Sequence, residues 1–548
     1  ASEENSELDV MGHLRSTTVD DDRNWALNED VVKYIHVHLF PMLDKIRTDM
    51  VQLHEEWKAI GRMVTLTHDS GQRYKGRSNA YVPSYAKARS TLCDFIMQGL
   101  FPSDEYLGVT SNASPNIINP PDALASKQYL QYQLERVAKI KQKLIPFVGQ
   151  YVDYGFAIGK GWYEQTSGGK KRMEGRRNKG GKPSFKQASV KGLEGMRFSA
   201  RSVMDWYVYP YHVDDLDEAT LIFEDIDVPR SYILERQRLK EWENCDLMLN
   251  VSQGTEHLRN KQDVQREQME TVTGDTVNAG SDIGDIRMVT EIWCDLVLPD
   301  AAYMDDEETG IPVPCMVVMG DDIIALVKRN PFWTQKHPYF VSRDDPKPGS
   351  FFSKGKGHLI QGLQYLVNDF VNQTNDNGIM GMNPMIIYNP STMAGPLTPI
   401  KPGGTWATTD VNGGIKFDRP PIEQVQYGQA LIQMFAAMVA DFSGAPPILQ
   451  GSKGGSTATT SQVLQKNALN PLKNTIENLE SNVMVPYVHM AWVLAQQYAS
   501  EELMIEIMGD TGGWSPKSMS REDILGDFSF QWLASTQAAN QAQRAEQG

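Results

Sequence analysis

A segment dense in proline and glycine separates two helical patterns in the C-terminal half of the chain. Residues 382–420 carry prolines and glycines at close intervals, and these residues interrupt both helices and strands. Before this segment, residues 351–381 place apolar side chains at steps of three and four, and residues 421–445 do so after it. The pattern predicts two helices that leave a domain, hold a compact module at their tip and return, which is a stalk.

Each predicted stalk helix has an apolar stripe at helical spacing. In the first helix the stripe is Leu359, Leu363, Leu366, Val367 and Phe370. In the second it is Ile422, Val425, Leu431, Met434, Phe435, Met438 and Phe442. The second stripe is predicted to face a core.

A glycine-rich loop follows the second helix. Residues 446–462 include Gln450-Gly-Ser-Lys-Gly-Gly-Ser-Thr, and a long helical pattern with Pro471 inside it follows. Proline removes a helical hydrogen bond, so a kink is predicted there. A phosphate-binding loop needs a Lys-Ser/Thr pair after its last glycine, whereas Lys453 precedes the glycines. We therefore expect an exposed loop rather than a nucleotide site.

The N-terminal part mixes helical and strand patterns. Residues 1–23 are polar and acidic and are predicted to form a flexible arm, and residues 24–350 a larger folded region. Helices are predicted at 25–64, 84–100, 121–155 and 230–249, and strands near 162–164, 204–209, 220–228, 288–298, 313–319, 323–328 and 339–342. The last four strands are expected to form one small antiparallel sheet. The predicted fold class is α+β.

Two stretches of this region read as insertions. Residues 252–285 lack periodicity, and residues 168–192 are glycine-rich and basic. The basic stretch contains the candidate phosphate contacts Lys170, Lys171, Arg172, Arg176 and Arg177. A solvated loop with no ligand is the alternative reading of the same residues.

Composition limits the possible functions. The 548 residues suffice for several domains, and the net charge of −16 argues against a general nucleic-acid binder. No apolar run approaches the roughly 18 residues of a membrane span, and the N-terminus does not resemble a signal peptide. The four cysteines have no metal-site spacing, so free thiols in a reducing compartment are expected.

The search for chemical motifs finds no catalytic arrangement. His36 and His38 are two apart on a helical pattern and face different directions, so they are poor metal ligands. The acidic run 305–308 fits a solvated hairpin tip, and Gly355-Lys-Gly fits a helix start better than a dinucleotide site. We therefore expect no enzyme activity, no metal and no cofactor.

The order of these segments resembles the portal (head–tail connector) protein of tailed bacteriophages, particularly short-tailed phages. Early motifs that carry the resemblance are Arg77-Ser-Asn-Ala-Tyr-Val-Pro, Leu100-Phe-Pro-Ser-Asp-Glu-Tyr-Leu and Ser199-Ala-Arg-Ser-Val-Met-Asp-Trp-Tyr-Val-Tyr-Pro. Later ones are Gly355-Lys-Gly, Ser456-Thr-Ala-Thr-Thr-Ser-Gln, Gly526-Asp-Phe-Ser-Phe and Asn540-Gln-Ala-Gln-Arg. The similarity spans about residues 25–545. Many relatives have an acidic residue where this chain has Thr460, Ser461 and Gln462.

The resemblance implies a wing, a two-helix stem, a small α/β clip at 382–420, a tunnel loop at 446–462, a kinked helix with a return to the wing at 463–534, and the start of a helical crown at 535–548. It implies a ring, typically a dodecamer, at one capsid vertex of a virion assembled in the host cytoplasm. Double-stranded DNA would pass through the ring.

The implied partners are further copies of the chain, the terminase motor, head–tail adaptor and tail proteins, and the major capsid protein, with no membrane. Clip candidates for partner binding are Trp406, Phe417, Lys401 and Lys416, and tunnel-loop candidates for DNA contact are Lys453, Ser452, Ser456 and Thr457. Two alternatives are another ring-forming adaptor or structural protein of the virion and a DNA-processing enzyme. The portal itself would carry no catalytic site.

Overall fold

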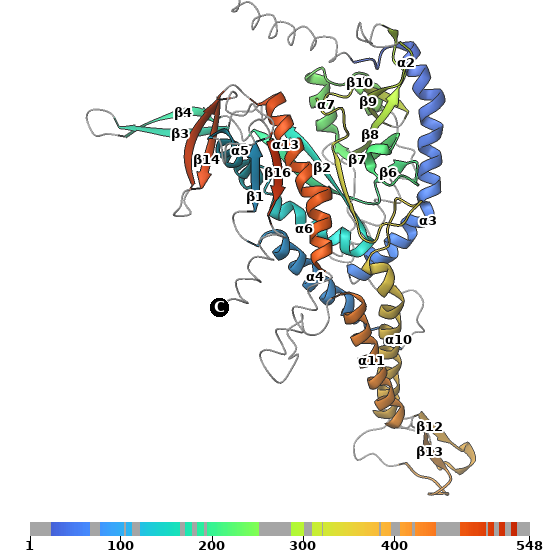
Figure 1. Cartoon of the computed structure of the whole chain (residues 1–548). Coiled ribbons are helices and arrows are strands. Elements are labelled where there is room, and N and C mark those ends of the chain that lie inside the picture. Colours follow the sequence, from blue (N-terminus) through green and yellow to red (C-terminus); the bar gives the residue numbers. More distant parts are fainter. Residues whose placement is uncertain are drawn as a thin grey trace, which may run out of the picture. The chain divides into compact units, whose positions relative to one another are not determined.

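The chain combines helices with antiparallel sheets, as the predicted α+β class requires (Figure 1). The computed structural model describes residues 24–65, 77–102, 106–111, 121–164, 170–177, 183–190, 194–250, 286–300, 309–320, 322–382, 385–395, 406–418, 422–444, 472–499, 502–508, 514–520 and 528–533. The chain divides into two compact units. The first comprises Ala1–Lys58, Cys93–Gly355 and Pro471–Gly548, and the second Ala59–Leu92 and Lys356–Asn470.

The first predicted helix is confirmed from Glu29 onward. Helix α2 spans Glu29–Tyr34, a π-helical turn spans Ile35–Leu39, and α3 spans Phe40–Val64. The side-chain oxygen of Asn28 caps α2, because it accepts hydrogen bonds from the amides of Asp30 and Val31. Residues before this cap are therefore excluded from the helix.

A five-stranded antiparallel sheet lies in the first unit. Its order is β10-β9-β8-β7-β6. The strands are β6 (Trp206–Tyr209), β7 (Leu221–Pro229), β8 (Ile286–Leu296), β9 (Val313–Gly320) and β10 (Ile323–Arg329). Each predicted strand from 204 to 328 is thus confirmed within a few residues. The helix predicted at 230–249 is two helices instead, α7 (Arg230–Arg238) and α8 (Cys245–Asn250), because Lys240 and Asn244 between them have positive φ.

A three-stranded sheet, ordered β11-β2-β5, belongs to the same unit. Its strands are β2 (Phe156–Glu164), β5 (Gly195–Arg201) and β11 (Tyr339–Arg343). The prediction that residues 339–342 join the same sheet as the strands at 288–328 is therefore wrong. Local sequence defines β11 as a strand, but its partner β2 lies far away in the sequence, so pairing depends on the tertiary fold.

The helix predicted at 121–155 is interrupted. Helix α5 (Pro121–Tyr132) runs into a π-helical turn at Gln133–Val137, and α6 (Ile140–Tyr154) begins after Lys139, whose φ is 51°. Left-handed backbone at a lysine ends a helix, which explains why one periodic pattern yields two helices.

Helix α6 ends at a close approach between two glycines. Gly155 has a φ of 85°, and a Cβ placed on Gly355 would collide with the backbone of Gly155 and Asp153. We expect Gly355→Ala to destabilise the first unit by about 1–3 kcal/mol, because neither backbone can move freely in a packed region. Thermal unfolding would measure this. Gly362→Ala is the control, since its Cβ would meet no atom within 4 Å, and a loss of stability there of equal size would contradict the argument.

The described residues also form four two-stranded sheets. They are β1 (Leu107–Ser111) with β16 (Phe528–Trp532), β3 (Lys170–Arg177) with β4 (Pro183–Val190), β14 (Glu502–Met508) with β15 (Trp514–Ser520), and β12 (Met385–Tyr388) with β13 (Ile415–Asp418). Within the basic stretch 168–192, residues 170–177 and 183–190 are thus paired strands, and the choice between phosphate contact and a solvated segment stays a prediction. Strands β1 and β16, which pair antiparallel, lie far apart in the sequence.

The C-terminal helix is described from residue 472. It continues to 479, passes through a π-helical turn at Glu480–Met484, and proceeds as α13 (Val485–Tyr498). Several predictions fall outside the described residues: the arm at 1–23, the insertion at 252–285, the loop at 446–462, the kink at Pro471 and the crown at 535–548.

The second unit contains the predicted stalk. Its helices are α10 (Lys356–Met382) and α11 (Ile422–Phe442), so the first starts five residues later than predicted and the second ends three residues earlier. Helix α4 (Ser84–Leu100) begins in this unit and has the predicted bounds. The β12/β13 hairpin and a short 3₁₀ turn at Pro390–Thr392 lie between α10 and α11 in sequence.

Candidate functional site: the helix pair and its terminal hairpin

Helices α10 and α11 pack side by side in opposite directions, with the β12/β13 hairpin at their shared end (Figure 1). The rings of Phe370 and Phe435 stack between them, with centroids 5.5 Å apart and an interplanar angle of 14°. Gly428 of α11 faces Thr374 of α10, and a Cβ at Gly428 would collide with the threonine hydroxyl. A glycine there allows the two helices to approach closely.

The outer surface of this helix pair is rich in apolar side chains. Tyr427 is 67% exposed. The other large exposed hydrophobic residues on the pair are Leu359, Tyr365, Leu366, Ile379, Met380, Met382, Met434, Met438 and Phe442. A single chain therefore leaves much of this surface in contact with water, and large apolar patches of this kind mark interaction surfaces.

These exposures correct the predicted core stripe of α11. Met434, Met438 and Phe442 were predicted to face a core, yet all are exposed in the single chain, as are Leu359 and Leu366 of α10. Two helices bury only the narrow strips that face each other, so part of each stripe stays exposed among the described residues. Periodicity predicted the helices correctly and their burial only in part.

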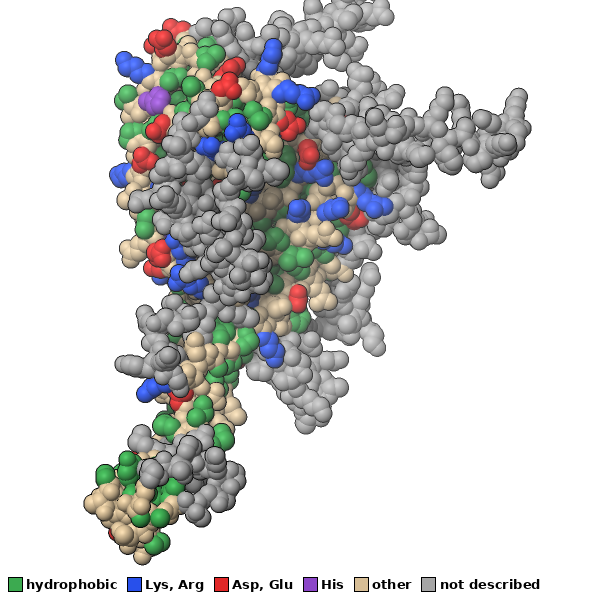
Figure 2. All heavy atoms as spheres, turned by 180° about the vertical axis from the view of Figure 1, so that it is seen from behind, with side chains coloured by type: hydrophobic (Ala, Val, Ile, Leu, Met, Phe, Trp, Pro, Cys, Tyr) green, Lys and Arg blue, Asp and Glu red, His purple; other side chains and the backbone are tan. Residues whose placement is uncertain are grey.

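Charged residues are scarce on the helix pair. Across α10 and α11 the sequence has one lysine, Lys356, and four carboxylates, Asp369, Asp376, Glu423 and Asp441. Figure 2 shows this region mostly in green and tan, with few red or blue side chains. A polyanion that ran along this surface would meet little positive charge, so it would be held weakly.

A row of polar side chains on α10 binds the backbone of residues 78–85. We call Gln364, Asn368, Asn372 and Asp376 the polar ladder; its first three members are buried. Asn372 accepts from the Ala80 amide through Oδ1 at 2.7 Å and donates to the Ala80 carbonyl through Nδ2 at 3.0 Å. The other members of the polar ladder form hydrogen bonds with backbone groups on either side of Ala80.

The other contacts continue this pattern in both directions. Asp376 Oδ1 accepts from the Ser78 amide at 2.7 Å. Asn368 Oδ1 accepts from the Val82 amide at 3.0 Å, and Gln364 Nε2 donates to the Val82 carbonyl at 2.6 Å. These hydrogen bonds are part-buried, and each gives a polar group that is partly shielded from water a partner within the chain.

The spacing of the polar ladder explains the fit. Four residues of an α-helix advance about 6.0 Å, and two residues of an extended chain advance about 6.2–6.8 Å. Members four apart on α10 therefore match backbone groups two apart in residues 78–82. Side-chain amides both donate and accept hydrogen bonds. Helix α10 therefore presents a row of donors and acceptors to residues 78–85, as the edge strand of a sheet would. The sequence signal, a polar residue every fourth position inside an apolar helix, was present but not recognised.

The terminal hairpin carries two of the predicted partner-binding residues. Trp406 and Phe417 stack, with centroids 6.4 Å apart, and Phe417 is 47% exposed. Phe417 lies opposite Ile386 in the β12/β13 register, and the exposed Lys416 lies opposite Ile387. The structure thus brings Trp406 and Phe417 together, while Lys401 lies outside the described residues. Among the described residues, this sheet has two strands, β12 and β13, and no third strand pairs with it.

The remaining predicted site residues are described less fully. Ser452, Lys453, Ser456 and Thr457 lie outside the described residues. Lys170, Lys171, Arg172, Arg176 and Arg177 lie on strand β3, which pairs with β4. The phosphate contacts predicted for both groups stay predictions.

A buried charge cluster joins the two larger sheets of the first unit. Lys160 Nζ on β2 lies 2.7 Å from Glu291 Oε1 on β8 and 3.3 Å from Glu224 Oε2 on β7. Glu224 also pairs with Arg201 of β5 at 3.1 Å and accepts from the Tyr339 hydroxyl at 3.0 Å. Glu224 and Glu291 are cross-strand partners, so without the two cations their like charges would destabilise the sheet.

The opposite face of the same strand pair carries a second polar contact. Asp225 and Thr290 are also cross-strand partners. Arg47 of α3 donates to Asp225 Oδ1 at 2.8 Å and to Thr290 Oγ1 at 3.0 Å. The neighbouring cross-strand pairs Glu224/Glu291 and Asp225/Thr290 therefore link the five-stranded sheet to the three-stranded sheet on one face and to α3 on the other. This organisation was not predicted from the sequence.

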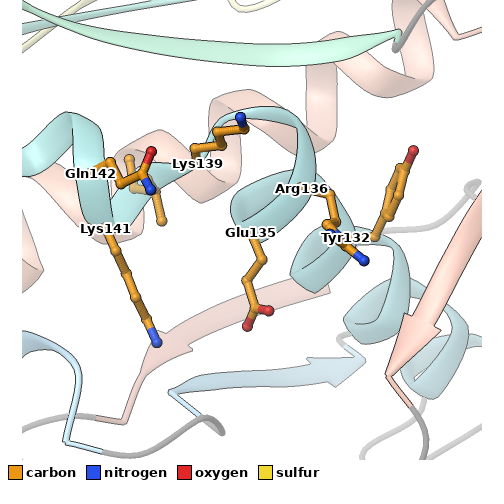
Figure 3. Close-up of a pocket in the computed structure, with 7 residues that line it drawn as sticks. Tyr132, Glu135, Arg136, Lys139, Lys141 and Gln142 are labelled. Carbon is orange, nitrogen blue, oxygen red and sulfur yellow. The ribbon is translucent and has the colours of Figure 1, made fainter. Parts of the chain in front are cut away.

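A hollow of about 570 Å³ lies beside the break between α5 and α6 (Figure 3). Glu135 and Lys141 point to the same side of it, Arg136 comes from the π-helical turn Gln133–Val137, and Lys139 precedes α6. Glu135 accepts from the Tyr106 hydroxyl at 3.2 Å, and Lys141 Nζ lies 5.5 Å from the centre of the Tyr106 ring. These charges are already engaged, and no nucleophile stands beside a base among the lining residues.

The described residues contain no group of three or more His, Cys, Asp or Glu side chains that could hold a metal ion. Among the helices in that same part of the chain, none is both long enough and apolar enough to cross a bilayer. Comparison with protein-family models and with curated proteins finds no match.

Proposed function

We propose that this chain is a portal protein: a ring-forming subunit that surrounds a channel for double-stranded DNA at one capsid vertex of a tailed phage. The observation that carries the proposal is the antiparallel pair α10/α11, which holds a small hairpin at its end and exposes apolar side chains such as Tyr427 and Met434. Copies placed side by side in a ring would bury that surface.

The charge of the helix pair supports a channel that does not grip DNA. One lysine against four carboxylates on α10 and α11 provides few contacts to phosphate, so DNA would slide rather than bind. The terminal hairpin, with Trp406 and Phe417 stacked, is suited to docking proteins such as a packaging motor and later an adaptor. In this proposal the chain has no catalytic role, and ATP hydrolysis belongs to the motor.

Electron microscopy of the purified protein, combined with mass measurement, tests the proposal. Rings of about twelve copies around a central hole are expected. A monomer at every concentration, together with nuclease or ATPase activity, would favour a DNA-processing enzyme instead. Rings that bind adaptor but never motor would favour another ring-forming head–tail protein.

Charge placed on the apolar surface of the helix pair should prevent ring formation. We expect Tyr427→Glu with Met434→Glu to reduce the ring fraction at least tenfold, since each carboxylate would have to be buried between copies. Size-exclusion chromatography with light scattering measures that fraction. The control is Gln426→Glu with Gln433→Glu, which adds equal charge at exposed neighbouring positions. Equal ring fractions for both double variants would show that the apolar surface is not the interface.

A further inference from the structure

Two cysteines lie directly opposite each other on adjacent central strands of the five-stranded sheet. Cys294 of β8 and Cys315 of β9 are register partners, and both are free thiols. Their exposed fractions are 9% and 1%. Directly opposite residues point to the same face of a sheet, so the two thiols share one buried environment.

The hydrogen-bond pattern around Pro314 sets the separation of this pair. The Pro314 carbonyl accepts from the Asn330 amide at 2.9 Å, so it points away from β8 and toward the chain that follows β10. Backbone groups alternate in direction along a strand, so those of Cys315 point toward β8. Cys294 and Cys315 therefore form a hydrogen-bonded pair, whose Cα atoms lie about 5.5 Å apart in an antiparallel ladder. Disulfides span Cα separations of about 4.4–6.8 Å.

We infer that Cys294 and Cys315 form a site of reversible disulfide formation, closed by a two-electron oxidant such as a peroxide or a small disulfide. One S–S bond forms, both thiol protons leave, and two electrons pass to the oxidant; hydrogen peroxide is reduced to two waters, and a small disulfide to two thiols. No other atom of the protein is required. This inference goes beyond the proposed function and does not depend on it.

The geometry also predicts how this bond behaves. Opposite Cβ atoms in such a pair lie about 4.5–5.5 Å apart, whereas a disulfide needs about 3.5–4.5 Å. Closing it pulls the strands together and stores strain, which makes the bond easy to reduce. Burial raises the pKa of the Cys315 thiol to about 12 and that of Cys294 well above its usual value. The thiolate is the reactive form, so oxidation is slow and waits for brief openings of the sheet.

The effect on the molecule would be a covalent link between β8 and β9. These strands lie inside the sheet rather than at its edges, and the opposite face of β8 carries Glu291 of the buried charge cluster. If the proposed function holds, the link would form when an assembled particle leaves the reducing interior of a cell.

Thiol counting on the full chain tests the inference. Native protein would be incubated with diamide at pH 8, then denatured and blocked with N-ethylmaleimide, and its intact mass measured. We expect two blocked thiols per chain instead of four, a disulfide that maps to Cys294 and Cys315, and four blocked thiols after dithiothreitol. Cys93→Ser with Cys245→Ser should keep the disulfide, while Cys294→Ser or Cys315→Ser should lose it.

The result that overturns the inference is four blocked thiols after the same incubation, or a disulfide that involves Cys93 or Cys245. Poor folding of Cys294→Ser would not affect the decision, because the Cys93→Ser/Cys245→Ser variant keeps both strand cysteines. The experiment needs no ring, so its failure leaves the microscopy result, and with it the proposed function, to be judged separately.

Discussion

Replacement of Lys160 by methionine is expected to destabilise the first unit by about 3–5 kcal/mol, because it removes one partner from a buried ion pair. Glu291 would lose the ammonium group 2.7 Å away, and Glu224 would keep Arg201 and the Tyr339 hydroxyl. The side chain of Lys160 is 7% exposed, so water cannot replace it without opening the contact between the two sheets.

The stability lost in Lys160→Met should depend on pH. Burial by itself would raise the pKa of Glu291, but the charge and hydrogen bond of Lys160 hold that pKa below its usual value. A carboxyl group whose pKa is lower in the folded state stabilises the fold at any pH above its pKa in the unfolded chain, which is about 4.3 for glutamate. This stabilisation is lost as the pH falls through the pKa of the folded state. The difference between wild type and Lys160→Met should therefore be largest near neutral pH and shrink below about pH 4.

Hydrogen–deuterium exchange of peptides from β2, β7 and β8 would measure this locally, since two compact units need not unfold in one step. Lys143→Met, an exposed lysine of α6, is the matched control and should change stability by no more than about 0.5 kcal/mol. If Lys160→Met exchanged as slowly as this control at neutral pH, the charge cluster would contribute nothing to stability.

Replacement of Asn372 by leucine should weaken the second unit by about 1–3 kcal/mol. The amide and carbonyl of Ala80 would each lose the partner of a part-buried hydrogen bond, and one such bond contributes about 0.5–1.5 kcal/mol. The added apolar surface offers no hydrogen bond in return. Because the polar ladder repeats every four residues, loss of its middle member should also loosen the contacts at Ser78 and Val82.

Exchange at the amides of residues 78–85 provides the direct measurement for Asn372→Leu, with urea unfolding as the second. Asn375→Leu makes the same chemical change three residues away at an exposed position of α10, so it controls for altered helix propensity. Protection of residues 78–85 that is equal in the two variants would mean that the polar ladder does not hold this segment.

The candidate site was predictable in its elements but not in its surfaces. The two helices and the intervening module follow from apolar spacing and from clustered proline and glycine, which act on neighbouring residues. Whether Leu366 or Met434 is buried depends on what packs against the helix, and among the described residues both side chains stay exposed. The same spacing is compatible with a protein core and with an interface between copies.

What the sequence determined by itself was local. Helix α4 has its predicted ends at Ser84 and Leu100, and strands β9 and β10 lie where alternation predicted them, because capping, turn and propensity signals act over a few residues. Only the tertiary structure decided the contacts between distant segments: β11 with β2, Lys160 between Glu224 and Glu291, and the polar ladder on Ala80. These depend on backbone groups and charges brought together from far apart in the chain, which no local pattern records.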